Sequence, residues 1–260
     1  MAAVHRIEGL IDCSAWTGRW PFLDLRFREL PALKDKLLSV GVTKAFVAPI
    51  EAILERDPFR ANRELLGKTP SGDGFFSPVV VLDLSFPNWR DSVELAAADG
   101  RVRMVKLLPN YHLYTLDRAR AAALTELTRR YGMVVSVQMR MEDTRGMYPA
   151  LRIGDVAVHE IISAAYAFPE QPFVLSNIQM HEIPSVLTSA PNIHFDISSV
   201  ETQDVMEVVH RSYGLDRFLF ASHTPFYYPE GTVNKLKHSA LSPEALAPVV
   251  RGNAEKLFGL

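Results

Sequence analysis

The sequence predicts a closed barrel of eight parallel β-strands and eight α-helices, a (β/α)8 barrel, formed as a single domain over residues 1–260. Short apolar runs rich in β-branched residues alternate along the chain with longer segments of helical periodicity, as expected for successive βα units. No linker, low-complexity tract or block of like charges interrupts this alternation. Eight such units in 260 residues fit one closed barrel better than the alternative, a doubly wound open sheet. That alternative also lacks the glycine-rich turn that dinucleotide-binding folds carry after the first strand.

Eight segments have the composition of strands. In order, they are Ile7–Ala15, Lys44–Ile50, Phe76–Leu84, Val102–Pro109, Met133–Met141, Pro172–Ile178, Asn192–Ser198 and Arg217–Ser222. Helical spacing of apolar residues predicts helices between them, for example over Asp117–Tyr131 and Val156–Ala167. The tail Ser242–Leu260 is expected to form the last helix, capped by Ser242 and broken at Gly252-Asn253.

Alternation along the strands predicts which side chains face the barrel axis. In the fifth and seventh segments apolar and polar residues alternate, and the apolar ones should meet the surrounding helices. The polar set should therefore face the axis: Ser136, Gln138, Arg140, His194, Asp196 and Ser198. By the same rule Ser14 points inward and Cys13 faces the helices. Inward side chains at the carboxyl ends of the strands build the active site of such barrels, and buried polar groups must be paired or functional.

Composition limits the partners and the compartment. A net charge of -2 and a pI near 6.5 exclude the basic surplus that nucleic-acid binding needs. One cysteine allows neither an internal disulfide nor a multi-cysteine zinc site, which fits a reducing compartment. Residues 1–9 lack the apolar core of a secretion signal, and no membrane span is apparent. We expect a cytoplasmic protein with a small-molecule substrate, no nucleic-acid or membrane partner, and self-association as an open question.

Three stretches resemble the amidohydrolase superfamily, in its branch of small metal-dependent hydrolases and decarboxylases. Residues Ile11–Gly18 resemble the first-strand pattern Ile-Asp-x-His-x-His-x-Gly. Residues Arg217–Phe226 are similar to the last-strand Gly-Ser-Asp-x-Pro signature, and Gly252–Gly259 to the closing Gly-Asn-Ala-x-x-Leu-x-Gly. The resemblance spans nearly the whole chain and implies a (β/α)8 barrel with hydrolytic activity.

The chain departs from this family at the positions of the metal ligands. Ser14 and Trp16 stand at the two first-strand histidine positions, and tryptophan cannot ligate a metal. The fifth-strand histidine position falls near Gln138, and the sixth-strand position falls on Ser176 or Asn177.

At the last strand, His223 replaces the aspartate that in the family binds metal and handles the proton of water. Lys106 on the fourth strand could match a family ligand only in a carboxylated form with a second metal. We therefore expect no metal ligands and no cofactor. The alternative is a relocated zinc site, with ligands drawn from His112, His181, His223 and Asp143.

Three residues are the expected catalytic groups. His223 is the expected general base or acid, because imidazole titrates near neutrality; a packed histidine is the alternative. Asp196 would orient His223 or neutralise Lys106 or Arg140, with a structural ion pair as the alternative. Lys106, Gln138 or Arg140 would stabilise negative charge on the oxyanion.

Six residues are expected to bind the substrate: Trp16, Tyr111, His112, Gln138, Arg140 and Asn177. Trp16 would form an apolar wall for a planar compound, and Tyr111 and His112 lie in the loop after the fourth strand. Arg140 could bind a carboxylate through two parallel hydrogen bonds, unless Asp143 and Asp196 neutralise the inner cations.

These features favour an enzyme, a hydrolase related to the amidohydrolases that acts on a small anionic carbonyl compound such as an amide, lactone or ester. Within the enzyme class, decarboxylation or a relocated metal site is the alternative. The alternative from another class is a non-catalytic barrel that binds a ligand or a partner protein. The polar inner set argues against it, because a decayed site would tend to fill with apolar residues.

Overall fold

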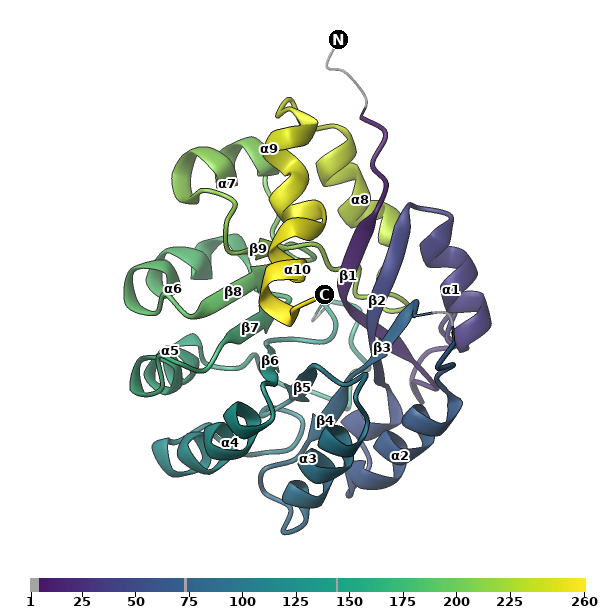
Figure 1. Ribbon diagram of the computed structural model, residues 1–260, viewed down its shortest axis with the longest axis vertical. Helices are drawn as coiled ribbons and strands as arrows, with labels where there is room; N and C mark the ends of the chain where they lie inside the picture. The colour runs from purple at the N-terminus through teal and green to yellow at the C-terminus, as the bar shows by residue number, and fades with distance from the viewer. Residues whose placement is uncertain (1–4, 73, 144) are drawn as a thin grey trace.

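The computed structural model describes residues 5–72, 74–143 and 145–260, and they form the expected parallel barrel (Figure 1). One sheet contains β1 (Leu10–Thr17), β2 (Val42–Pro49) and β3 (Phe76–Pro78). The other contains β4 (Val80–Leu82), β5 (Met104–Leu107), β6 (Val134–Gln138), β7 (Phe173–Ser176), β8 (Ile193–Asp196) and β9 (Phe218–Leu219). All pairs within the sheets are parallel. Each of the eight predicted strands is confirmed.

The two sheets join into a closed ring. Strands β3 and β4 are the two halves of the predicted strand Phe76–Leu84, divided at Pro78, which has no N–H for the ladder. Val79 nevertheless donates its N–H to the Val47 carbonyl at 2.8 Å. On the other side, the Cys13 N–H donates to the Phe220 carbonyl at 2.9 Å, so β1 pairs with the chain that follows β9. Paired edges of this kind are what closes a barrel.

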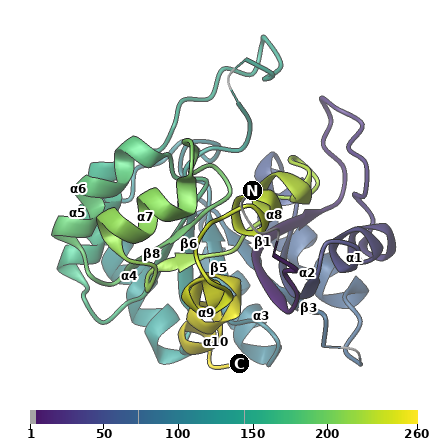
Figure 2. The ribbon, with the colours of Figure 1, turned by 90° about the horizontal axis from the view of Figure 1, so that it is seen from above.

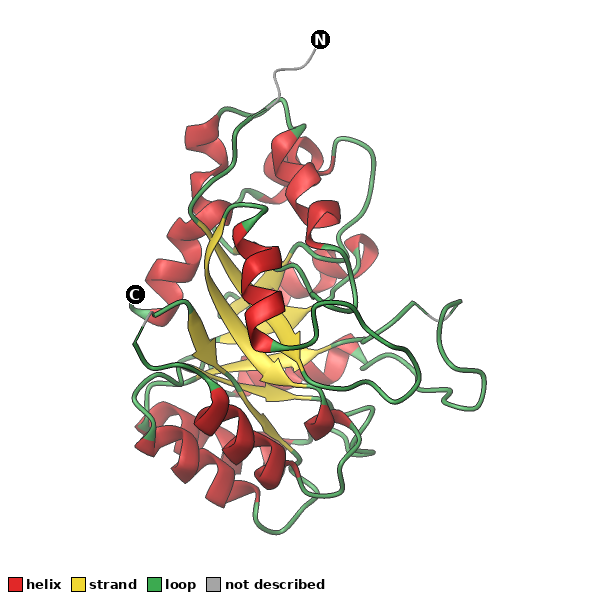
Figure 3. Ribbon diagram, turned by 90° about the vertical axis from the view of Figure 1, so that its right-hand side faces the viewer, coloured by secondary structure: helices red, strands yellow, loops and turns green. Residues whose placement is uncertain are grey.

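Helices cover the outside of the strands, as Figure 3 shows, and fit the predicted pattern. They are α1 (Leu30–Leu38), α2 (Pro58–Lys68), α3 (Trp89–Ala98), α4 (Arg118–Arg130), α5 (Val158–Ala167), α6 (Ile183–Ser189), α7 (Val205–Tyr213), α8 (Pro229–Lys237), α9 (Pro243–Ala247) and α10 (Asn253–Phe258). Ser242 caps α9 as predicted, accepting from the Ala245 N–H at 3.3 Å. The break expected at Gly252-Asn253 is instead a π-helical turn, Pro248–Gly252, that continues into α10. Within the described part of the chain, no helix has the length and apolar character needed to cross a lipid bilayer.

In most strands, alternate residues contribute to two separate apolar layers, one under the helices and one inside the barrel. In β5, Val105 and Leu107 pack under the helices, whereas Met104 joins an inner cluster with Phe46 and residues from the other strands. Phe258 of α10 packs against Phe46, with ring centroids 4.2 Å apart, and fills the amino end of the barrel. Polar side chains are therefore left for the carboxyl end, where the site is expected.

A bulge in β1 changes the direction of one side chain. The register between β1 and β2 shifts between Asp12 and Ala15, so that β1 carries one extra residue. Cys13 consequently belongs to the inner cluster, and the prediction that it faces the helices is wrong. Ser14 still points inward, as predicted, and contacts Lys106.

Gly41, just before β2, occupies a position where a side chain has no room. Its φ is +94°, and a Cβ there would lie 2.5 Å from the Ile7 carbonyl oxygen. Gly132 also has positive φ, +63°, but a Cβ there would meet no atom within 4 Å. We expect Gly132→Ala to lower the free energy of unfolding by about 1–2 kcal/mol through backbone strain. Gly41→Ala should cost at least about 1 kcal/mol more, because it also overpacks. Urea denaturation measures both, and equal losses would contradict this account.

Candidate active site at the barrel mouth

A buried lysine lies inside the carboxyl end of the barrel. The Lys106 ammonium donates to Ser14 Oγ at 2.9 Å, to Gln138 Oε1 at 3.0 Å and to Ser176 Oγ at 3.4 Å. The Trp16 ring centroid lies 4.8 Å from Nζ. Three acceptors match the three N–H groups of an ammonium, and the lysine is 1% exposed. Strands β1, β6 and β7 thus hold a cation away from water.

Two buried carboxyl groups, Asp196 and Asp12, act on this cation at longer range. Burial lowers the pKa of Lys106 to about 8, while the charges of Asp196 and Asp12 oppose that change. Asp196 accepts hydrogen bonds from the backbone N–H groups of Asn177 and Ser198 at 3.1 and 3.0 Å. Of the roles expected for Asp196, the structure thus supports neutralising Lys106, and its carboxylate oxygens bond to groups other than His223.

Hydrogen bonds hold both ring nitrogens of His223. The Trp16 indole N–H donates to Nδ1 at 3.1 Å, and Nε2–H donates to the Met141 carbonyl at 2.8 Å. Burial lowers the pKa of His223 to about 3, so the ring is neutral. These partners fix the tautomer. In this arrangement neither nitrogen is free to take a proton from water.

Acidic residues from two loops neutralise Arg140. Its Nε donates to Asp155 at 3.0 Å and its Nη2 to Glu182 at 2.7 Å. Neither of the aspartates considered from the sequence fills this role, and Asp143 instead pairs with Arg145 at the surface. The guanidinium is therefore compensated inside the protein.

The two amides expected at the substrate form part of the same frame. Gln138 donates to Asn177 Oδ1 at 2.6 Å and to the Arg140 carbonyl at 2.7 Å. Asn177 adopts a left-handed backbone, with φ of +60°, and donates to Ser199 Oγ at 3.0 Å. Both side chains are buried, so they fix the loops around Lys106.

Aromatic residues cover the mouth. Trp20 packs edge-to-face on Phe226 and Tyr111, with centroids 5.4 and 6.3 Å apart. Trp20 comes from the loop after β1, and Figure 2 shows that this loop and the loop after β6 project from the same end of the barrel. Phe22 and Tyr148 stack at 5.0 Å and join the two loops. These side chains and the loops that carry them close over the site.

The remaining histidines lie outside this cluster. His112 Nε2 contacts the Ala52 carbonyl at 3.1 Å and its ring stacks on Tyr114, while His181 is exposed. Among the described residues, no three His, Cys, Asp or Glu side chains are grouped to hold a metal ion. The relocated zinc site is therefore not assembled.

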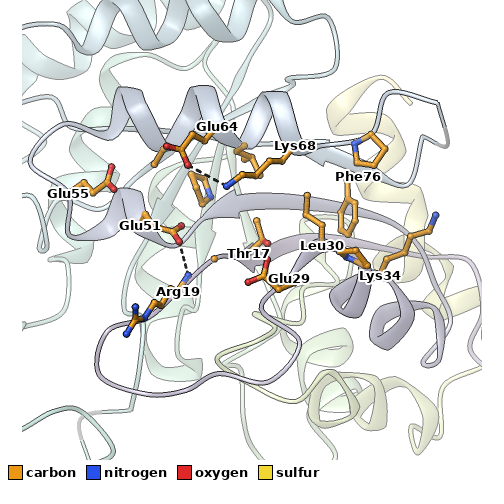
Figure 4. A pocket seen from close by; sticks show the side chains of 16 residues that line it. Thr17, Arg19, Glu29, Leu30, Lys34, Glu51, Glu55, Glu64, Lys68 and Phe76 are labelled. Carbon is orange, nitrogen blue, oxygen red and sulfur yellow. Dashed lines mark hydrogen bonds and ion pairs between the residues drawn. The ribbon is translucent and has the colours of Figure 1, made fainter.

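An open groove lies outside the barrel. It has a volume of about 510 Å³ and runs between α1 and α2, with an apolar floor that includes Leu65 and Phe76 (Figure 4). Some of the charged residues at its rim interact with one another: Glu64 contacts Lys68 at 3.4 Å, and Glu51 accepts a hydrogen bond from the Arg19 backbone N–H at 2.8 Å. None of the groups around Lys106 lines it.

A (β/α)8 barrel with a buried polar cluster at the carboxyl ends of its strands has the architecture of a barrel enzyme. The amidohydrolase family profile matches residues 27–260, and the chain belongs to the amidohydrolase family. The match begins after the altered first-strand motif. No curated protein sequence matches the chain.

Solved structures share the fold at low sequence identity. One is an uncharacterized TIM-barrel protein from Bordetella bronchiseptica, with 16% identity and a TM-score of 0.71, covering 96% of this chain and 98% of that one. A 2,6-dihydroxybenzoate decarboxylase complexed with 2,6-dihydroxybenzoate has 14% identity and a TM-score of 0.77, covering 98% and 100%. A 5-carboxyvanillate decarboxylase from Novosphingobium aromaticivorans with bound manganese has 14% identity and a TM-score of 0.72, covering 100% and 99%. These likenesses confirm the predicted fold.

The same structures correct the expectation that no cofactor is involved. Solved proteins with this fold contain bound manganese, so the fold is one that carries a metal cofactor, and the prediction of none is wrong. The side chains described here do not fit such an ion: Trp16 and the Lys106 ammonium occupy the mouth, and the described residues form no group of three suitable ligands. We therefore derive no catalytic step through a metal.

Proposed function

We propose that this chain is an amidohydrolase-family enzyme that acts on a small anionic carbonyl compound at the barrel mouth, with a substrate oxygen directed to Lys106. The buried ammonium beside the flat Trp16 ring carries the proposal. A substrate oxygen could replace Ser176, the most distant of its three acceptors. Away from water, one ammonium can strongly stabilise charge that develops on such an oxygen.

Hydrolysis of an amide, lactone or ester is the leading reaction, because its carbonyl oxygen gains negative charge. Decarboxylation is the alternative, supported by the decarboxylases that share this fold. In both cases the aromatic mouth suits a planar substrate.

Entry of the substrate requires the cover to open. Trp20, Trp16 and Lys106 are each at most 2% exposed. Met141, whose carbonyl holds His223 Nε2, lies in the loop after β6, which ends at Gln138. Movement of this loop would free that nitrogen, and we assign His223 its proton-handling role in the open state, with Asp196 keeping Lys106 charged.

A non-catalytic binding barrel is the second candidate. One observation favours it: in the closed state Lys106 and His223 are both fully hydrogen-bonded to protein groups. Side chains whose hydrogen-bonding atoms are all occupied by protein groups are found in structural cores as well as in enzymes without bound substrate.

Binding and turnover assays on the full chain separate these possibilities. We expect benzoate at about 100 times its Kd to raise the free energy of unfolding by about 2.7 kcal/mol in thermal denaturation. We also expect at least one amide, lactone, ester or aromatic acid to be converted, with products followed by chromatography and CO₂ release. Assays run with and without added manganese, because relatives contain it. Binding without turnover would favour the binding barrel, and no binding would contradict both.

A further inference from the structure

Glu142, in the loop after β6, has a carboxylate oxygen that no described residue satisfies. Glu142 is partly buried, and its Oε2 is enclosed by protein yet accepts no hydrogen bond from any described residue. Burial raises the pKa of Glu142, as expected for an enclosed carboxylate. The next residue, Asp143, is exposed and paired with Arg145. The chain thus leaves the inner of two adjacent carboxylates unsatisfied.

Two further polar atoms beside Glu142 also lack partners within the described ranges. They are the indole N–H of Trp20 and the hydroxyl of Tyr111, in side chains that are 2% and 9% exposed. The Trp20 N–H faces Glu142 and favours its charged form, and the Glu142 charge adds to burial in raising the pKa of Tyr111. The Trp20 N–H approaches Glu142 without reaching the geometry of a full hydrogen bond, and the Trp20 ring packs on Tyr111, so three polar atoms without a full hydrogen bond come from neighbouring side chains of three loops. Buried polar atoms without hydrogen bonds are rare in native proteins, and a bound ligand can supply the missing hydrogen bonds.

The charged and aromatic residues around Glu142 determine which sign of charge a ligand there should carry. Asp155, which also adds to the raised pKa of Tyr111, is paired with Arg140 at 3.0 Å, whereas the carboxylate of Glu142 has no cationic partner among the described residues. The charge of Glu142 would repel a carboxylate or phosphate. The rings of Trp20, Tyr111 and Phe226 meet at interplanar angles of 68° and 75°, which gives a corner of aromatic faces. Aromatic faces beside a carboxylate attract an ammonium group, which could donate to Glu142 Oε2 and Tyr111 Oη.

We infer that Glu142, Trp20, Tyr111 and Phe226 form a second subsite of the mouth, which binds a protonated amino group of the substrate. The inference rests on the proposed function, because Lys106 takes a substrate oxygen at the other end of the same molecule. The substrate class is therefore zwitterionic: a planar carbonyl compound with an amino group distant from its carboxylate.

Three benzoates of similar size test the inference by isothermal titration calorimetry. They are 4-(aminomethyl)benzoate, 4-(hydroxymethyl)benzoate and 4-methylbenzoate, which share the carboxylate and differ at the far end. We expect the amino compound to bind at least about tenfold more tightly than the methyl compound, as for a charge-assisted hydrogen bond. Glu142→Gln should reduce this ratio to about twofold or less and leave the affinity for 4-methylbenzoate unchanged. Asp143→Asn, which removes the adjacent carboxylate, should keep the full ratio.

Tyrosine variants separate ligand binding from internal packing. Tyr111→Phe should weaken binding of the amino compound about threefold or more while leaving the melting temperature of the free protein unchanged or higher, because it removes an unsatisfied hydroxyl. Tyr114→Phe is the control: its hydroxyl is also buried and makes no full hydrogen bond with a described residue, but the side chain lies in the outer layer near the Leu84 backbone, so this variant should leave binding of the amino compound unchanged. A lower melting temperature for Tyr111→Phe, with binding unchanged, would show that the hydroxyl serves only packing and would overturn its part in the subsite.

The outcomes also separate the two proposals. Equal affinities for all three compounds would overturn the amino subsite and leave the proposed function standing. Equal affinities for the amino and hydroxyl compounds would overturn the assignment of a cation. If no compound binds, both proposals fail.

Discussion

Replacing Lys106 by methionine is expected to lower carboxylate binding and turnover by at least about 100-fold, the scale seen when one preorganised oxyanion donor is removed. Methionine keeps the apolar stem against the Trp16 ring and removes the charge. Binding of benzoate by calorimetry and turnover of the substrate found in the assays measure the loss.

Lys44→Met is the matched control for this change. Lys44 lies on β2 and contacts the Gly74 carbonyl at 3.0 Å, away from the mouth. This variant should bind and convert substrate like the parent chain. Far-ultraviolet circular dichroism and a cooperative thermal transition check that both variants fold. Unchanged benzoate affinity in folded Lys106→Met would remove Lys106 from the proposed function.

The barrel itself was predictable because its signals are local. Alternation in β6 and β8 identifies the polar inner set, and five of its six members are buried, Gln138 and Asp196 completely. His194 is the exception: it lies at the amino end of β8 and is only partly buried. Alternation gives the face of a strand but not the depth along the barrel axis.

The partners of the inner charges were not predictable, because they come from distant loops. Arg140 and Glu182 are far apart in the sequence, as are Met141 and His223, so no local sequence pattern predicts that they form hydrogen bonds. Glu142 was missed for the same reason: only the folded loops show that it is enclosed, whereas Asp143 is exposed.

One residue of the site could have been found from the sequence. Asp12 lies two positions before Ser14 in the first-strand motif, and the family pattern also has aspartate there. The structure shows it fully buried, accepting from the Ser222 N–H at 2.9 Å and the Ser222 hydroxyl at 2.5 Å. The bulge in β1 makes its exact direction unpredictable from alternation.

The contribution of Asp12 to the free energy of unfolding is expected to fall as the pH rises from about 4 to about 7, so this free energy should rise more steeply with pH in Asp12→Asn than in the parent chain. Burial lowers the pKa values of His223 and His194 to about 3 and about 4, and these histidines act in the opposite direction in both proteins, so their effect cancels in the comparison. Burial raises the pKa of Asp12 from 3.8 to about 7, although the hydrogen bonds from Ser222 and Ser14 oppose it. The folded state keeps a proton that the unfolded chain releases, so the stabilisation is complete below pH ~4 and is lost as the pH rises through ~7. A shift of about three pKa units corresponds to roughly 4 kcal/mol. Urea denaturation at several pH values between about 4 and 7.5 measures the slope.

The pH range and the control follow from the neighbouring charges. Above pH ~8 the lowered pKa of Lys106 acts in the opposite direction, because the unfolded chain then binds the extra proton and stability rises with pH. Measurements therefore stop near pH 7.5. Asp143→Asn should leave the slope unchanged, because the hydrogen bonds from Arg145 lower the pKa of Asp143 to about 2, below this range. The amide introduced by Asp12→Asn can still accept from the Ser222 N–H, so a slope in this variant equal to that of the parent chain would mean that another group, such as Asp196, holds the proton.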